Sequence, residues 1–175
     1  ISWATASTID HSDLTWSVQT VLSALKNQDF LTLAKFVWRS GLRFSPYEYV
    51  NTWTDVIMDT DLVAHAQLLS RTFLWWSYDG SWLPIDLSVG QYFEKFVNDA
   101  DYTHAPEILY NQHVQRGNTI NNIPDVYQGK TWIEFHFTGF DAQYGWIDRK
   151  SLRLVWNQVD GQRELIGIVH GQWTI

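Results

Sequence analysis

The chain has 175 residues, of which 45% are hydrophobic and 16% aromatic, and its formal net charge is −7. This length favours one domain, and the hydrophobic content excludes a disordered chain. An acidic chain without a visible basic stripe does not suit nucleic acid or an anionic membrane surface as partner. Cysteine is absent, which excludes disulfides, thiolate catalysis and cysteine metal sites.

The amino-terminal third predicts two helices after an extended lead-in over residues 1–12. Ser12 is a suitable N-cap for a helix over residues 13–26, because its hydroxyl can accept a bond from a terminal backbone N–H. Asp29 can cap a second, short helix that Ser40-Gly41 ends. The first helix carries an apolar stripe at helical spacing, formed by Leu14, Val18, Val21, Leu22 and Leu25.

The middle of the chain changes to the period of strands. Residues 42–50 predict a strand that bends at Pro46, since proline cannot donate to a sheet. Residues 55–70 are ambiguous, with Asp61 as a candidate helix cap. Residues 72–78 and 82–87 predict a hairpin around Asp79-Gly80.

The segment after this hairpin begins with a helix and then loses its apolar pattern. Ser88 is a suitable cap for a helix over residues 89–98, and residues 99–128 are polar and predict loops. No run of apolar residues approaches the length of a membrane span.

The last third, residues 131–175, contains three apolar-rich runs joined by turn residues. Along the first run, Glu134 and His136 share one face and Ile133 and Phe135 the other, because side chains alternate along a strand. The sequence therefore predicts one α+β domain over residues 1–175. Its core is a curved antiparallel sheet of four to six strands wrapped around the amino-terminal helices.

Two phrases, LSALKNQDFLTLAKFV and SLRLVWNQVDGQRELIGIVHGQWTI, resemble the first helices and last hairpin of the nuclear transport factor 2-like superfamily. That superfamily includes ketosteroid isomerase and polyketide cyclases. The resemblance implies a cone-shaped fold with a pocket at its open mouth. Dimerisation through the convex side of the sheet is common in this fold, so the resemblance leaves a homodimer open.

Further phrases resemble a group of uncharacterised bacterial envelope lipoproteins: GLRFSPYEYV, WSYDGSWLPIDL, YFEKFV, GNTINNI, SLRLV and IGIVHGQWTI. This resemblance covers most of the chain and implies export to the periplasm, the cell surface or the medium, but no activity. The chain begins with Ile1 and lacks the lipid-bearing cysteine of such proteins. We expect either that an upstream segment carried this cysteine or that the protein is freely secreted.

Glu134 and His136 are the candidates for acid–base catalysis, since two such groups on one strand face can share a proton. The alternative, which we favour, is that Glu134 pairs structurally with Arg153 across two strands. Arg43, Arg153 and His170 are candidate ligand contacts. The residues give no hydrolase, zinc-protease or phosphate-loop motif and no ligand spacing among the six histidines, so we expect no metal and no cofactor.

The aromatic cluster of Trp75, Trp76 and Trp82 is the remaining candidate binding surface. Alternation places one of Trp75 and Trp76 outside, where an exposed ring can stack on a sugar or contact a protein. The sequence therefore leaves three hypotheses. The first is a non-catalytic exported domain that binds a small ligand or an envelope partner; the others are an isomerase- or cyclase-type enzyme and a carbohydrate-binding module.

Overall fold

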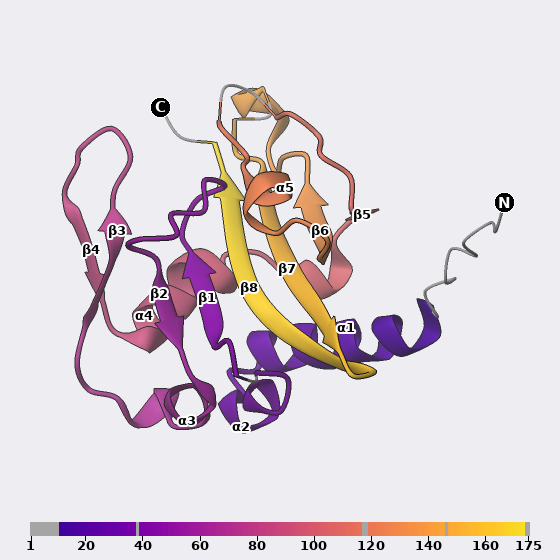
Figure 1. Cartoon of the computed structure of the whole chain (residues 1–175). Coiled ribbons are helices and arrows are strands. Elements are labelled where there is room, and N and C mark those ends of the chain that lie inside the picture. Colours follow the sequence, from indigo (N-terminus) through magenta and orange to yellow (C-terminus); the bar gives the residue numbers. More distant parts are fainter. Residues whose placement is uncertain (1–10, 38, 117–118, 146, 174–175) are drawn as a thin grey trace, which may run out of the picture.

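The protein is an α+β structure with a six-stranded sheet and a separate hairpin (Figure 1). The computed structural model describes residues 11–37, 39–116, 119–145 and 147–173, so most of the expected lead-in lies outside the described residues. The helical segments are α1 (His11–Lys26), α2 (Phe30–Ala34), α3 (Thr60–Ala64), η1 (Ala66–Leu68), α4 (Val89–Tyr92), η2 (Phe93–Val97), η3 (Tyr102–His104), α5 (Ile123–Val126) and η4 (Ala142–Tyr144). The strands are β1 (Leu42–Ser45), β2 (Val56–Met58), β3 (Phe73–Ser77), β4 (Pro84–Leu87), β5 (Glu107–Tyr110), β6 (Thr131–Phe137), β7 (Lys150–Val159) and β8 (Gln162–Gln172).

The large sheet has the strand order β2-β1-β8-β7-β6-β5, and β3 pairs only with β4. The expected class, helices followed by a sheet of four to six strands, is confirmed. The sheet is mixed rather than purely antiparallel, because β1 runs parallel to β8 with Phe44 opposite Ile168. The chain reaches β8 only after four further strands of the same sheet, and no local pattern in the sequence reports this long-range pairing.

One side of the large sheet, the helix face, is covered by α1, α2 and the continuous α4–η2 segment (Figure 1). Its core is filled by aromatic side chains. The Trp75 ring stacks on Tyr92 at 3.7 Å between centroids, and Phe44 contacts both rings edge-on. The hollow that the sheet forms around the leading helices is therefore occupied by protein side chains.

The opposite side, the loop face, is covered by the β1–β2 connection and by α5. Val50 and Ile123 pack there on Val155 and Val169 of the central strands. Asn122 fixes the two covering segments to each other, because its amide bonds both the N–H and the C=O of Val50. These residues of the central strands are therefore covered by the chain itself.

Several local predictions differ from the structure. α3 is capped by Asp59, whose carboxylate accepts a bond from the Leu62 N–H, and Asp61 lies inside its first turn. Ser12 lies within α1, which begins at His11. The segment expected as loop, residues 99–128, contributes the edge strand β5, held by pairing with β6, and the short helix α5.

In the last strand the simple alternation fails at one point. A register shift between Val155 and Trp156 changes the pairing with β8. Leu165 and Ile168 therefore both face the helices, whereas Ile166 lies with the loop-face residues. An extra residue on one strand of this kind reverses the side-chain alternation beyond it. Among the described residues, none of the helices combines the length and hydropathy needed to cross a membrane.

Candidate functional site

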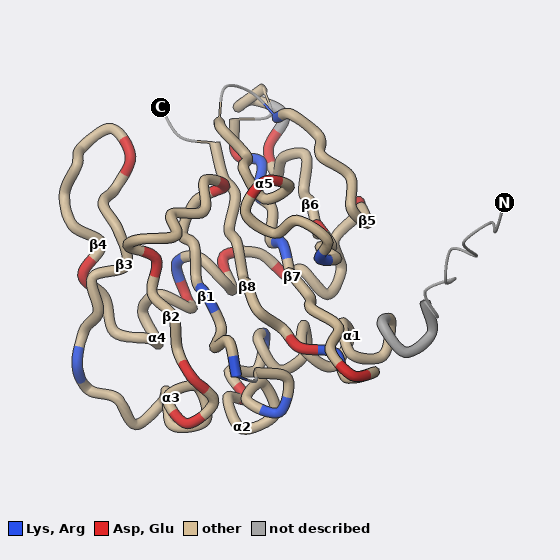
Figure 2. Tube along the Cα trace, in the orientation of Figure 1, with Lys and Arg blue, Asp and Glu red and all other residues tan. Residues whose placement is uncertain are grey.

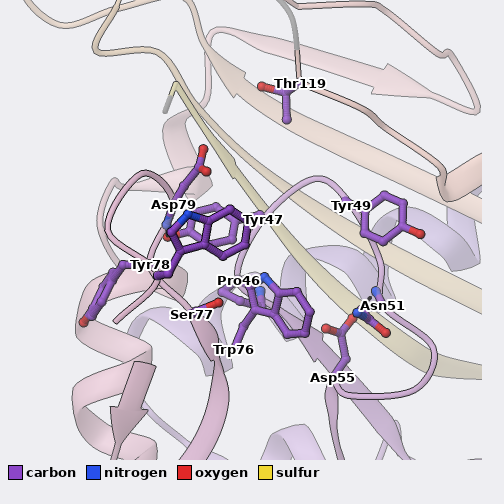
Figure 3. Close-up of a pocket in the computed structure, with 11 residues that line it drawn as sticks. Pro46, Tyr47, Tyr49, Asn51, Asp55, Trp76, Ser77, Tyr78, Asp79 and Thr119 are labelled. Carbon is purple, nitrogen blue, oxygen red and sulfur yellow. Dashed lines mark hydrogen bonds between the residues drawn. The ribbon is translucent and has the colours of Figure 1, made fainter. Parts of the chain in front are cut away.

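A cavity of about 230 Å³ lies between the β1–β2 connection and the β3–β4 hairpin (Figure 3). Five of the side chains around it are aromatic and two carry a carboxylate. Its lining consists of Pro46, Tyr47, Tyr49, Asn51, Asp55, Trp76, Ser77, Tyr78, Asp79, Trp82 and Thr119. Apolar walls with a few convergent polar groups are typical of small-molecule sites.

The β1–β2 connection is held in shape by its own polar groups. Pro46 follows β1 and its carbonyl accepts a hydrogen bond from the His170 ring at 3.0 Å. At the far end, the Oδ2 atom of Asp55 accepts bonds from the Ser45 hydroxyl at 2.5 Å and from the Asn51 N–H at 3.0 Å. The loop is therefore closed on itself by a buried carboxylate. Tyr49 is presented from it with about half of its surface exposed.

The opposite wall is the tip of the β3–β4 hairpin. A backbone bond from Tyr78 to the Leu83 carbonyl, at 2.7 Å, closes the hairpin loop. The Tyr47 hydroxyl joins the two walls, because it accepts a bond from the Asp79 N–H at 3.2 Å. Trp82 has a φ of +58° and exposes 77% of its surface at the rim. This backbone conformation is unfavourable for a bulky residue and is often found where a side chain has a functional role.

The adjacent residues Trp75 and Trp76 have different environments. β3 is irregular between Leu74 and Trp76 in its pairing with β4, so Trp75 is an extra residue on its strand. Trp75 is completely buried, and its indole N–H donates to the Leu87 carbonyl at 2.9 Å. Trp76 faces the cavity (Figure 3). The candidate role of Trp75 as a ligand contact is therefore wrong, because its ring belongs to the core.

Burial raises the pKa of Asp55 to about 6, although its bonds to Ser45 and Asn51 and the charge of Arg43 act in the opposite direction. Desolvation is the dominant cause, since an ionised carboxylate loses its hydration when it is enclosed. Arg43 does not line the cavity; its Nη1 atom donates to the Asn51 carbonyl at 3.2 Å and supports the loop from behind. An ionised Asp55 would therefore be stabilised by a positive group entering the cavity.

The candidate catalytic residues lie elsewhere, in a buried polar cluster on the loop face. Arg153 donates to the Glu134 carboxylate at 2.8 Å and lies 3.5 Å from Glu48. Arg116 approaches the same Glu134 oxygen at 3.4 Å. Glu134 and Arg153 are each 1% exposed. The cross-strand pair is present, and its charges are compensated within the protein.

The close fit of this cluster involves Gly171 on β8. A Cβ atom at this position would lie 2.8 Å from both the Arg153 Nη1 atom and a Glu48 oxygen. Glycine is therefore the residue that allows the arginine and the carboxylate to approach β8, where any side chain would collide.

His136 belongs to the same cluster and also lines a second depression at the surface. Its Nδ1 atom lies 2.8 Å from the Ser151 hydroxyl, and both side chains are almost fully buried. Burial is the main cause that lowers the pKa of His136 to about 4, and the charge of Arg116 adds to it. The ring is therefore neutral at pH 7. It also lines a wider and more open depression together with Arg116 and Arg149.

His170 lies on the helix face, apart from Glu134, His136 and Arg153. Its ring contacts Phe96, and its Nε2 atom is 3.0 Å from the Asp99 carboxylate. Both ring nitrogens face acceptors, namely Asp99 and the Pro46 carbonyl. The structure thus places His170 on the face of the sheet opposite Glu134, His136 and Arg153, because neighbouring strand positions point to opposite faces.

Sequence reasoning found Trp76 and Trp82 but not most of the cavity. The sequence does contain a pattern that could have pointed to Tyr47 and Tyr49, since they are two residues apart directly after a proline bend. No local pattern points to Asp55, because its role depends on burial. No group of three or more His, Cys, Asp or Glu side chains in the described part of the chain could hold a metal ion.

No protein-family model matches the chain, and no curated protein does. Among solved structures, it is similar to a crystal structure of an NTF2-like protein from Cytophaga hutchinsonii ATCC 33406. The TM-score is 0.40 at 10% sequence identity, over 94% of this chain and 99% of the other. At this level of similarity we transfer no property of that protein to this chain.

Proposed function

We propose that this domain binds a small organic ligand without transforming it, in the cavity between the β1–β2 connection and the β3–β4 hairpin. The observation that carries the proposal is the aromatic lining with one buried carboxylate. The strained backbone of Trp82 supports it, since an unfavourable φ at an exposed tryptophan serves no evident packing role. The cavity is smaller than the roughly 300–1,000 Å³ of sites for drug-sized molecules, so the ligand, or its bound part, is compact.

The enzyme hypothesis has less support. Glu134 is neutralised by Arg153 at 2.8 Å, and Ser151 beside His136 is only 2% exposed. A general base has to reach its substrate directly or through one water molecule. Neither Glu134 nor His136 lines the aromatic cavity.

A carbohydrate ligand is the second candidate, and the exposure of Trp82 favours it. Sugars stack on exposed aromatic rings, and Asn51, Ser77 and Thr119 would supply hydrogen bonds at the same cavity. Stacking on two coplanar tryptophans would require Trp76 and Trp82 together, since Trp75 is buried.

We also propose that the domain acts outside the cytoplasm, in the bacterial envelope or beyond it, free or lipid-anchored. Support comes from the sequence phrases that resemble envelope lipoproteins. An envelope protein is an alternative partner, and the rim residue Trp82 and the loop-tip residue Trp53, 94% exposed, would then contribute to the interface.

A thermal-shift screen with steroids, lipid headgroups, small amines and oligosaccharides tests the proposal. A ligand at about 100 times its Kd stabilises the folded state by roughly 2.7 kcal/mol, which corresponds to a Tm increase of about 5–10 °C for a chain of this size. We expect Trp76→Leu to abolish the increase and Trp53→Leu, a change outside the cavity, to preserve it. The proposal would be wrong if every stabilising compound acted equally on the Trp76→Leu variant.

A further inference from the structure

The walls of the aromatic cavity favour positive charge. Aromatic rings carry negative charge on their faces and attract cations positioned over them. Two carboxylates, Asp55 and Asp79, add full negative charges, and no Lys, Arg or His side chain is among the described residues that line the space. Figure 2 shows acidic segments on both walls, at the tip of the β3–β4 hairpin and next to β2.

Two cationic side chains contact residues of the walls but do not themselves line the cavity. Arg43 is directed to the Asn51 carbonyl. The Lys95 ammonium lies 5.0 Å from the ring centroid of Tyr78, and in Figure 3 this ring lies apart from those of Trp76 and Tyr49. The space between Trp76, Tyr49 and Asp55 therefore has no cation supplied by these side chains.

The size and polarity of the cavity restrict the kind of cation. An inorganic ion would keep its hydration and gain little from rings, and no metal-binding group of side chains is found in the described residues. An organic ammonium carries its charge on carbon groups that make apolar contacts with aromatic faces, which is how aromatic cages recognise quaternary ammonium ligands. A volume of about 230 Å³ suits a head group of this kind.

We propose that the cavity binds an organic monocation of the ammonium class, with Asp55 as its counter-ion and the faces of Trp76 and Tyr49 as its walls. This inference rests on the proposed function and names the ligand class of the same site. Two sources present the same chemistry, a free compound such as choline and the headgroup of a zwitterionic lipid.

Calorimetric titration of the 175-residue chain with choline and with its neutral isostere, 3,3-dimethylbutan-1-ol, isolates the contribution of charge. We expect choline to bind at least tenfold more tightly than the alcohol. Asp55→Asn should remove this preference, whereas Asp86→Asn, which removes an exposed carboxylate of the β3–β4 hairpin outside the cavity, should leave it unchanged. Trp76→Phe keeps an aromatic face and should retain measurable choline binding, whereas Trp76→Leu should lose it. Circular dichroism confirms that each variant is folded.

Co-sedimentation with phosphatidylcholine vesicles distinguishes the two sources. Sedimentation that requires Asp55 indicates a headgroup ligand, and choline binding in solution without sedimentation indicates the free compound. Equal binding of choline and the alcohol, an unchanged preference in Asp55→Asn, or no choline binding would overturn the inference. The proposed function would still stand if another compound stabilised the protein in a Trp76-dependent way, and both would fail if none did.

Discussion

Asp55→Asn is predicted to make the protein more stable at neutral pH, although it removes a side chain that makes two hydrogen bonds. Burial raises the pKa of this carboxyl from 3.8 to about 6. Keeping it ionised at pH 7.5 therefore costs about 3 kcal/mol, at roughly 1.4 kcal/mol for each pH unit of difference. The amide oxygen of asparagine can still accept bonds from Ser45 and from the Asn51 N–H. The raised pKa already includes the attraction to Arg43, so the expected net gain is about 1–3 kcal/mol, with the full cost of ionisation as its upper limit.

The stability difference between the wild type and Asp55→Asn should depend on pH in a definite direction. A carboxyl whose pKa is raised by folding binds its proton more tightly in the folded state, so its favourable contribution is complete below the unfolded value of 3.8. The contribution is lost as the pH rises to about 6 and stays constant above that. The advantage of Asp55→Asn should therefore be largest at pH 7.5 and should approach zero near pH 4.

Urea denaturation followed by tryptophan fluorescence measures the effect, with Asp86→Asn as the control for removal of a surface charge. The m-value should not change, since both proteins expose the same surface on unfolding. A variant that is less stable than the wild type at pH 7.5, or whose difference is the same at pH 4, would refute the reasoning. Together with lost ammonium binding, a gain in stability would identify Asp55 as a group kept for function at the expense of stability.

Two further predictions concern the buried charges. Arg153→Met should lower the free energy of unfolding by about 3–5 kcal/mol, because the buried Glu134 loses its hydrogen-bonded cation and keeps only the more distant Arg116, while Glu48 loses its partner. In urea titrations, adding Glu134→Gln should restore part of the loss. A single variant within about 1 kcal/mol of the wild type would contradict this expectation. Burial alone would raise the pKa of Asp99, but its hydrogen bond and charge interaction with His170, together with a nearby lysine, lower it to about 2. Because this pKa is lowered by folding, the stabilisation is present above pH 4 and disappears as the pH falls to about 2. The stabilisation amounts to about 2 kcal/mol. An acid titration followed by circular dichroism should therefore show that Asp99→Asn loses less stability than the wild type between pH 4 and pH 2. An identical pH dependence in the two proteins would count against the role of the Asp99–His170 pair.

The Glu134–Arg153 pair shows how far local pattern reaches. Strand alternation places both residues on one face of neighbouring strands, and the register puts them directly opposite each other. The alternation of side chains does not show which face of the sheet the helices cover, since both faces of these strands are buried. His170 illustrates this limit, because it lies on the other side of the sheet from the residues with which it was grouped.

By itself, the sequence determined the two leading helices, the hairpin around Asp79-Gly80, the three terminal strands and the presence of exposed tryptophan near that hairpin. These features depend on periodicity and turn chemistry, which act over a few residues. Only the tertiary structure decided that β1 joins β8 in parallel and that Trp75 enters the core while the partly buried Trp76 lines the cavity. It also brought Asp55 into one cavity with the tyrosines of its own loop and with hairpin residues from Trp76 onward, more than 20 positions further along the chain. The cavity exists because segments distant in sequence meet, and burial there changes the chemistry of a carboxyl that the sequence presents as an ordinary aspartate.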